Sequence, residues 1–445
     1  MIGNFMGTNM GTSMTKSNTM SLKRRRALKL IGSTAGLSIL GACAAPGIVT
    51  EQKKLGRVLV VGAGFGGATA AKYLKTWAGS QIEVLLVERN REFVSCPMSN
   101  LVIGGSSNMA DITMSYSGLR DRGIAVVQDE VLSIDPKSRK VSFTKLADQS
   151  FDRIIVSPGV EFQFDSVQGL NADAQKTVLH AWKAGAETLQ LRQQLEAMPD
   201  GGVYVISIPK APYRCPPGPY ERASQVAHYF KTKKPKSKVI VLDGNEDIVS
   251  KKGLFLKAWE SYAGILEYRK NSLVTELDLK NSTVITELGD KVKGDVLNVI
   301  PAMAAGAIAR SAGLVNANNR WCNVDWQSME STAHAGIHVL GDATLAAALM
   351  PKSGHMANQH GKAAAAAIIE MMNGRPVQPM MMANTCYSFV DDKNAVHVAS
   401  VHAWDAEKKT MVTVPTSGGL STAQNELEGA YAKAWAKNIW ADMLT

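Results

Sequence analysis

The chain has 445 residues, of which 45% are hydrophobic and 20% are charged, and it is long enough for two or three domains with buried cores. This composition excludes a disordered or collagen-like chain, and no apolar run in the body of the sequence is long enough to span a membrane. The formal net charge is +10, but the first 44 residues hold six basic and no acidic side chains. The rest is only weakly basic and gives no basis for nucleic-acid binding.

The N-terminal segment has the pattern of an export signal. The basic run Lys23–Arg26 precedes a weakly apolar stretch at residues 28–40 and then small residues, which resembles a twin-arginine signal peptide. That route carries folded proteins, so it suits a cofactor loaded in the cytoplasm and predicts a periplasmic protein. Two endings remain open. Residues 42–44 (Ala-Cys-Ala) fit a cleavage site, and the same cysteine fits a lipoprotein box that would place a lipid anchor on Cys43.

A glycine-rich turn follows the first predicted strand. Residues 56–61 (GRVLVV) are mostly apolar, as in a buried parallel strand, and Gly62–Gly67 (GAGFGG) then precedes a helical pattern. A second apolar strand at residues 82–87 leads into an acidic residue 21 positions beyond the last glycine. In this context the turn predicts a dinucleotide site, where backbone N–H groups hold a pyrophosphate and the carboxylate binds a ribose. The candidate residues are Gly62, Gly64, Gly67, Glu88 and Arg89.

A second α/β unit repeats this order without a phosphate site. Helical patterns at residues 181–198 and 219–232 alternate with apolar strands at residues 203–208 and 239–243. Where a pyridine-nucleotide enzyme would have a glycine turn, residues 209–219 are instead rich in proline, which lacks the N–H group that a phosphate needs. We therefore expect an NAD-type fold without NAD, with a cysteine in the place of the nicotinamide.

Two later strands are predicted to return to the first unit, at residues 296–300 and 336–340. The second strand leads into Gly341-Asp342-Ala343. This element resembles the C-terminal FAD-binding segment of flavoproteins that have two dinucleotide domains. Gly341 and Asp342 are therefore assigned to FAD.

A helix N-terminus is the next predicted contact of the flavin. Lys352 and Ser353 precede an alanine-rich helix predicted at residues 363–371. The positive end of a helix dipole stabilises negative charge, as on a reduced flavin. Lys352 and Ser353 are therefore candidate cofactor-binding residues.

These patterns predict an α/β fold with two Rossmann-like domains and a C-terminal α+β domain. The predicted divisions are a signal peptide (1–44), a discontinuous FAD-binding domain (55–165 and 300–377), an NAD-type domain without NAD (166–299) and a C-terminal domain (378–445). Five cysteines occur, at positions 43, 96, 215, 322 and 386. An oxidising compartment would allow disulfides among them, but their number does not decide the pairing.

Several motifs together are similar to one family, the flavoprotein subunit of flavocytochrome c sulfide dehydrogenase, within the sulfide:quinone oxidoreductase group of flavoproteins. The similarity runs from about residue 55 to the C-terminus. The motifs that resemble the family are Gly62–Gly67, Cys96–Asn100 (CPMSN), Arg214–Ala223 (RCPPGPYERA), Pro351–Gly354 (PKSG) and Asn384–Ser388 (NTCYS).

The resemblance implies FAD as the cofactor and assigns roles to individual residues. Cys215 and Cys386 match the family's redox-active disulfide beside the flavin, and Glu221 matches a glutamate near that redox centre. Cys96 matches the cysteine that is joined through its sulfur to the flavin, although a non-covalent FAD remains open. Cys322 matches no position with a catalytic role and is interpreted as structural.

The resemblance also implies the reaction, which is oxidation of sulfide to elemental sulfur or polysulfide. Hydrosulfide would attack the disulfide, and the electrons would pass through FAD to a separate c-type cytochrome subunit in a heterodimer, since this chain has no Cys-x-x-Cys-His haem motif. Two alternatives stay open. One is a sulfide:quinone oxidoreductase, which needs a membrane-facing amphipathic segment. The other is a non-catalytic flavoprotein that activates a sulfur-oxidising partner.

Overall fold

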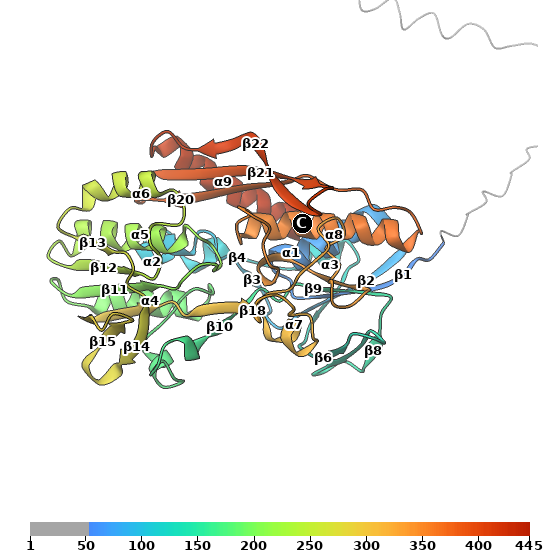
Figure 1. The fold of residues 1–445 in the computed structure, drawn as a ribbon, viewed down its shortest axis with the longest axis horizontal. Coiled ribbons are helices and arrows are strands. Elements are labelled where there is room, and N and C mark those ends of the chain that lie inside the picture. The colour runs from blue at the N-terminus through green and yellow to red at the C-terminus, as the bar shows by residue number, and fades with distance from the viewer. Residues whose placement is uncertain (1–52) are drawn as a thin grey trace, which may run out of the picture. The chain divides into compact units, whose positions relative to one another are not determined.

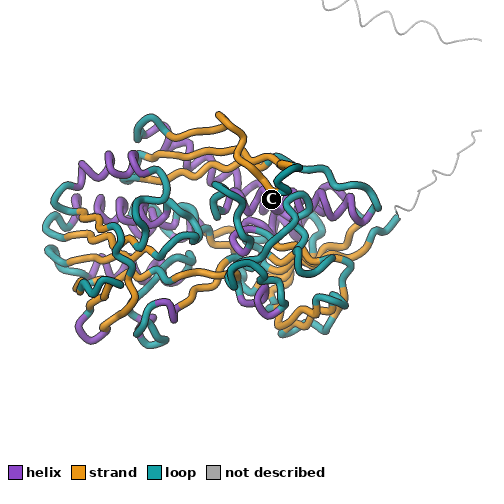
Figure 2. Tube along the Cα trace, in the orientation of Figure 1, coloured by secondary structure: helices purple, strands orange, loops and turns teal. Residues whose placement is uncertain are grey.

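The computed structural model describes residues 53–445, so the predictions for the export signal and for Cys43 lie outside the described residues. Within this part of the chain, two parallel sheets occupy opposite sides of the view and the C-terminal elements, in red, run along its upper edge (Figure 1). Figure 2 shows that helices lie beside the strands of both sheets. This arrangement confirms the predicted α/β class with two Rossmann-like units.

The first parallel sheet contains the predicted strand–turn–helix–strand unit. Its five strands follow the order β19-β9-β1-β2-β5, and every neighbouring pair is parallel. The central strands are continuous runs of valine, leucine and isoleucine whose side chains are buried. This is expected where helices or other layers cover both faces of a parallel sheet. The bounds are β1 (Gly56–Val61), β2 (Ile82–Glu88), β5 (Ala125–Gln128), β9 (Arg153–Val156) and β19 (Ile337–Val339).

Helices α1 (Phe65–Ala78) and α8 (Gly354–Met372) pack against each other in this unit. The approach is close because both helices carry glycine at the contact: a Cβ added to Gly361 would lie 2.5 Å from the carbonyl oxygen of Gly66. Helix α8 begins well before the predicted start at residue 363. The reason is a cap, since Ser353 Oγ accepts a hydrogen bond at 3.1 Å from the backbone N–H three residues on.

The second parallel sheet has four strands in the order β13-β12-β11-β17. The strand at residues 296–300 was predicted to return to the first unit, and this prediction is wrong because β17 pairs with β11. The pairing agrees with the predicted bounds of the NAD-type domain (166–299). The chain returns to the first unit through β18 (Ala302–Ala305), which pairs antiparallel with β10 (Val160–Gln163) between the two sheets (Figure 1). The bounds are β11 (Val203–Ile208), β12 (Lys238–Asp243), β13 (Leu266–Arg269) and β17 (Val296–Val299), with helices α4 (Ala186–Ala197) and α5 (Gly218–Lys233).

The C-terminal elements connect both units. Three antiparallel strands, β20 (Met382–Phe389), β21 (Ala395–Asp405) and β22 (Thr410–Leu420), are followed by helix α9 (Glu426–Leu444). Strand β20 contacts α8 of the first unit and α5 of the second, while α9 contacts α1. Residues of β20 are therefore placed at the junction between the two Rossmann-like units.

The remaining elements are short or lie at the edges. Across residues 53–445, no helix combines the length and the hydropathy that crossing a membrane requires. The shorter helices are α2 (Ser99–Gly104), α3 (Ser117–Asp121), α6 (Lys252–Trp259) and α7 (Ala307–Ser311). The smaller strands are β3 (Phe93–Val94), β4 (Thr113–Met114), β6 (Val131–Asp135), β7 (Lys140–Phe143), β8 (Gln149–Ser150), β14 (Val274–Asp278), β15 (Thr283–Thr286) and β16 (Lys291–Lys293).

Candidate active site

A cavity of about 940 Å³ lies where the two parallel sheets and β20 meet. Its volume is in the upper part of the range usual for small-molecule and cofactor sites. Gly67 and Lys352 are not among the residues that line it, although both were candidate site residues. The candidates that do line it are Gly62, Gly64, Glu88, Arg89, Cys96, Cys215, Glu221, Gly341, Asp342, Ser353 and Cys386.

The turn between β1 and α1 shapes one wall of the cavity. A Cβ added to Gly67 would lie 1.8 Å from the carbonyl oxygen of Gly62, so only glycine lets the helix approach the turn this closely. A Cβ added to Gly64 would meet nothing within 4 Å, which shows that this residue faces open space. The unpaired N–H groups in the first turn of α1 are therefore available to an anionic group in the cavity.

Glu88 ends strand β2 at the same edge of the sheet. Its Oε2 accepts a hydrogen bond from Ala63 N–H at 2.8 Å, and its Oε1 accepts one from Asn90 N–H at 2.8 Å. These contacts hold the carboxylate beside the glycine turn. Arg89 lies at the rim, where its side chain is 60% exposed and its Nη1 is 3.7 Å from Glu130.

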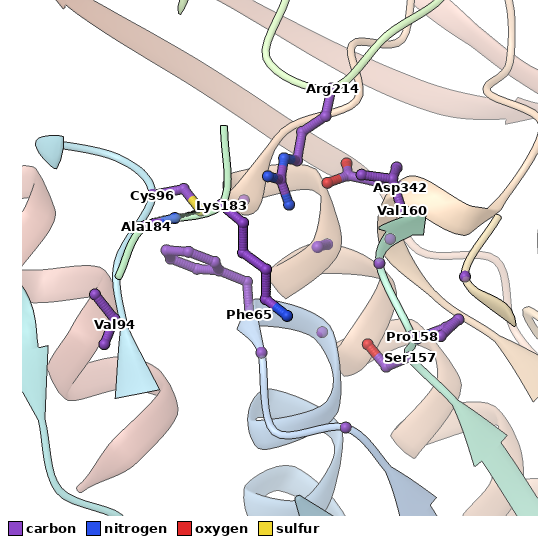
Figure 3. Close-up of a pocket in the computed structure, with 18 of the residues that line it drawn as sticks. Phe65, Val94, Cys96, Ser157, Pro158, Val160, Lys183, Ala184, Arg214 and Asp342 are labelled. Atoms are coloured by element: carbon purple, nitrogen blue, oxygen red, sulfur yellow. Dashed lines mark hydrogen bonds between the residues drawn. The ribbon is translucent and has the colours of Figure 1, made fainter. Parts of the chain in front are cut away.

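Asp342 follows β19 and reaches the cavity from the first sheet. Its Oδ1 is buried and has no hydrogen-bond partner in the described chain. Burial raises the pKa of this carboxyl, and the charges of Arg214 and Lys352 oppose the increase. In Figure 3 the guanidinium of Arg214 faces the carboxyl group. A buried oxygen without a partner is costly unless a ligand satisfies it, so this atom fits a hydroxyl of a bound group such as the ribityl chain of FAD.

Lys352 supports the site from outside the cavity lining. Its Nζ donates to the carbonyl oxygen of Asp342 at 2.9 Å and to that of Thr344, and lies 3.7 Å from the centroid of the Trp321 ring. Burial lowers the pKa of this lysine to about 8. The lysine therefore fixes the turn after β19, while the neighbouring Ser353 lines the cavity and donates to Asn384 Oδ1 at 2.7 Å.

Three of the four described cysteines line the cavity, and all four are free thiols in this structure. Cys96 accepts a hydrogen bond from Ala184 N–H, with the nitrogen 3.5 Å from the sulfur (Figure 3). Cys322 is fully buried and does not line the cavity. The structure thus brings Cys96, Cys215 and Cys386 to one cavity and leaves Cys322 in the core.

Cys215 lies in the turn that leads into α5. Its φ of 59° is in the left-handed region, and its N–H donates to the carbonyl oxygen of Lys352 at 2.8 Å. A Cβ added to Gly218 would lie 2.8 Å from Cys215 Sγ, so glycine leaves room for the sulfur. Burial raises the pKa of the Cys215 thiol, and the nearby Cys386 and Glu221 raise it further. The two sulfurs and the carboxyl group therefore influence one another electrostatically.

Glu221 is in the first turn of α5 and only 9% exposed. Its Oε1 accepts a hydrogen bond from Phe389 N–H at 2.8 Å, and its Oε2 accepts one from Asn100 Nδ2 at 2.8 Å. Burial raises the pKa of Glu221, while these hydrogen bonds and the charges of Lys251 and Arg222 oppose the increase. A buried carboxyl group with a raised pKa is a candidate proton acceptor.

Family models match three segments of the chain. Residues 56–197 match the pyridine nucleotide-disulphide oxidoreductase model. Residues 188–301 match the central model of the sulfide dehydrogenase [flavocytochrome c] flavoprotein chain, and residues 378–444 match the flavin-binding model of flavocytochrome c sulphide dehydrogenase. The sulfide dehydrogenase flavoprotein chain of Chlorobaculum thiosulfatiphilum is 59% identical over 46 residues, which cover 94% of that sequence and 10% of this chain. The chain belongs to this family.

Sulfide:quinone oxidoreductases are similar to this flavoprotein-family chain over longer stretches. The mitochondrial enzyme of Dictyostelium discoideum is 23% identical over 309 residues, so this chain spans 66% of that relative's length. The sulfide:quinone oxidoreductase structure from Aquifex aeolicus superposes with a TM-score of 0.70 at 17% identity, covering 87% of this chain and 91% of the other. At that identity the likeness shows the shared fold.

Sequence reasoning gave no role to the arginine that follows Glu221 in the family string. Arg222 is 1% exposed, and its Nε donates to Asn100 Oδ1 at 3.0 Å. Its Nη atoms donate to the carbonyl oxygens of His180 and Ala181 at 2.8 and 2.7 Å. Because Asn100 also donates to Glu221, Arg222 holds the partner that orients the carboxyl group. The sequence signals for Arg222 were its place in the family string and in the helix predicted at residues 219–232.

Proposed function

We propose that this chain oxidises hydrosulfide with FAD and a Cys215–Cys386 disulfide, and that it passes the electrons to a c-type cytochrome subunit. The observation that carries the proposal is that these two cysteines, far apart in the sequence, line one cavity together with the buried carboxyl group of Glu221. Two sulfurs beside a flavin can accept a sulfide nucleophile and pass on two electrons. Membership of the flavoprotein family supports the same reaction.

The cavity also has groups that suit FAD. The glycine turn at residues 62–67 would hold the pyrophosphate, Glu88 would bind a ribose, and Asp342 would accept a hydrogen bond from the ribityl chain. When bound, FAD supplies a two-electron acceptor that can release electrons one at a time. The family's flavin-binding model supports this cofactor.

Cys96 is the proposed point of covalent attachment. It lines the cavity as a free thiol, and among the described residues its sulfur accepts a hydrogen bond from a backbone N–H, that of Ala184, and from no side chain. We expect acid-precipitated wild-type protein to retain yellow flavin, whereas Cys96→Ser releases all of it, as measured by absorbance of pellet and supernatant. Equal release from both proteins would contradict the covalent link without touching the sulfide reaction. Cys322→Ala, outside the cavity, is the control.

In the sulfur step, the electrons are exchanged between the two cysteines and the substrate. Hydrosulfide attacks one sulfur of the disulfide, a sulfur–sulfur bond to the substrate forms, and the bond between Cys215 and Cys386 breaks. Its electron pair leaves on the other cysteine as a thiolate, so the sulfide sulfur is oxidised and the pair is reduced. A second hydrosulfide can then attack the outer sulfur of the persulfide, so that the bond to the cysteine breaks and the cysteine leaves as a thiolate. The released disulfide anion is the first polysulfide, and further chain growth yields elemental sulfur.

Glu221 is the proposed proton acceptor in this reaction. Because burial raises its pKa above the ordinary value of 4.5, the carboxyl ionises at higher pH than a free glutamate, and flavin reduction should fall as pH drops through that raised pKa. We expect Glu221→Gln to slow reduction by about 10²- to 10⁴-fold and to remove this acidic limb. Rates of anaerobic flavin reduction across pH would test this. Glu221→Asp should keep the limb, and an unchanged profile in Glu221→Gln would contradict the role.

The electron acceptor and the location complete the proposal. The family is named as the flavoprotein chain of a flavocytochrome c. We therefore propose that this chain forms a heterodimer with a c-type cytochrome subunit. The shared fold with a sulfide:quinone oxidoreductase favours quinone as the second candidate acceptor. We also propose export to the periplasm by the twin-arginine route, with a lipid anchor on Cys43 as the alternative ending of the leader.

Anaerobic titration of the purified holoprotein with sulfide tests the proposed function. Loss of the oxidised flavin absorbance at about one sulfide per flavin would support it, and addition of cytochrome c or of a short-chain quinone would then show which acceptor restores the absorbance. No loss of absorbance at a large excess of sulfide would overturn sulfide oxidation. In that case a non-catalytic role in activating a partner would be the better explanation.

A further inference from the structure

A buried lysine lies beside the cysteine pair and has no part in the function proposed above. Lys251 precedes helix α6, has a left-handed backbone with a φ of 58°, and is only 5% exposed. Its Nζ donates to the carbonyl oxygen of Cys386 at 3.0 Å and to Ser388 Oγ at 2.7 Å. The second Rossmann-like unit therefore reaches across to strand β20 at the residue that carries one of the two sulfurs.

The charge of Lys251 is not neutralised by an ion pair. Both hydrogen-bond acceptors are neutral, and no salt bridge joins its Nζ to any carboxylate within residues 53–445. A buried ammonium is costly without a counter-charge. Burial accordingly lowers the pKa of Lys251 to about 8, while the surrounding acids oppose the decrease. The lysine therefore needs an anion nearby, above all below that pH, where it is protonated.

Four ionisable groups face Lys251 from the elements packed around it. They are Cys386 on β20, Cys215 before α5, Glu221 on α5 and Glu428 on α9. The Glu428 carboxylate already accepts hydrogen bonds from His397 and Ser421. Both oxygens of Glu221 accept hydrogen bonds from neutral donors. Of the four groups, Cys386 raises the pKa of Lys251 most, and it is also the residue whose carbonyl oxygen the lysine contacts.

The contacts of Lys251 favour one sulfur over the other. The ammonium group of Lys251 donates a hydrogen bond to the carbonyl oxygen of Cys386. The backbone N–H of Cys215 instead donates a hydrogen bond to the carbonyl oxygen of Lys352. Burial raises the pKa of Cys386, and the charge of Lys251 is the largest influence that opposes this. For Cys215, burial and the charges of Cys386 and Glu221 all raise the pKa, and each of these effects is larger than that of any cation that lowers it.

We infer that Lys251 is a positioning residue that fixes β20 and compensates negative charge on the Cys386 sulfur, so that Cys386 ionises before Cys215 in the reduced protein. The inference deepens the proposed function and rests on it, because an anionic sulfur is what disulfide opening produces. The charge of Lys251 would stabilise either a thiolate or a persulfide anion at Cys386. A cation beside a thiol lowers its pKa and so increases the fraction of reactive thiolate.

Alkylation of the reduced holoprotein measures the two thiols separately. The protein is reduced anaerobically with dithiothreitol, desalted, treated with iodoacetamide across pH, and then digested so that each cysteine peptide is quantified by mass spectrometry. The midpoint of the pH dependence reports thiol ionisation independently of how accessible each sulfur is. In wild type, the midpoint for Cys386 should lie below that for Cys215. The reverse order would overturn the inference without any variant.

Removal of the charge gives the second test. Lys251→Met should raise the Cys386 midpoint by about one pH unit, which is about a tenfold loss of alkylation rate at neutral pH. Lys251→Arg should keep the low midpoint because it keeps the charge. Lys252→Met, at the exposed neighbour that pairs with Asp247, makes the same charge change and should shift nothing. An unshifted Cys386 midpoint in folded Lys251→Met overturns the inference. Should that variant not fold, Lys251→Arg and the wild-type order still decide it.

The two levels of the proposal fail separately, because alkylation involves no sulfide. If sulfide does not bleach the wild-type flavin but Lys251→Met still shifts the Cys386 midpoint, the proposed reaction fails and the role of Lys251 in thiol ionisation stands. If sulfide bleaches both proteins equally and the midpoint does not move, the inference fails and the proposed reaction stands.

Discussion

Cys215→Ser is expected to lose sulfide-driven flavin reduction by about 10³-fold or more while it keeps bound FAD. A serine oxygen cannot form the disulfide, so hydrosulfide has no sulfur–sulfur bond to attack. The side chain lies in a turn where Gly218 leaves room for it, and serine is smaller than cysteine, so the fold should be preserved. Anaerobic stopped-flow absorbance of the flavin after mixing with sulfide measures the rate.

Cys322→Ala is the matched control for this experiment. Cys322 is fully buried but does not line the cavity, so its removal tests for general effects of losing a buried thiol. We expect near wild-type bleaching from this protein. Rapid bleaching that persists in Cys215→Ser would contradict the disulfide route. Equal loss in both variants would show that the loss comes from the fold and not from the chemistry.

Gly67→Ala is expected to lower the free energy of unfolding of the apoprotein by about 4 kcal/mol or more. The added Cβ would lie 1.8 Å from the carbonyl oxygen of Gly62, and that neighbour is backbone that cannot rotate away. Relief of the clash would move α1 away from β1 in the middle of the first unit. Urea denaturation of the apoprotein, followed by circular dichroism, measures the change and avoids any contribution from FAD binding.

Gly64→Ala provides the contrast within the same turn. A Cβ at Gly64 would meet nothing within 4 Å, so the apoprotein should unfold at nearly the wild-type urea concentration. The added methyl group would project into the cavity, so FAD should bind more weakly. Similar destabilisation of both variants would contradict the assignment of Gly67 to packing and Gly64 to the ligand wall.

Much of the first unit was predictable because its signals are local. An apolar strand, a glycine turn and a helical pattern are each set by residues within a few positions of one another, and β1, α1 and β2 formed as expected. The pairing of β17 was not predictable in this way. Both sheets accept a short apolar parallel strand, and only the packing of the whole chain placed it beside β11.

The start of helix α8 is a second feature that the local sequence did not predict. The alanine-rich run predicted a helix, but the histidine, asparagine and glutamine before it gave no clear helical signal. The cap at Ser353 and the close contact of Gly361 with α1 extend the helix toward the cavity. Local composition thus identified the element, and tertiary contact decided where it begins.

By itself, the sequence determined two Rossmann-like units, the glycine turn, the family motifs and the candidate cysteines of the site. Only the tertiary structure decided which side chains share the cavity: it placed Lys352 outside the cavity lining and brought Lys251 to Cys386. It also showed that Arg222 holds Asn100, the partner of Glu221. The physical reason is that strands and turns are set by neighbours along the chain, whereas the site is built from segments that meet only when separate units pack together.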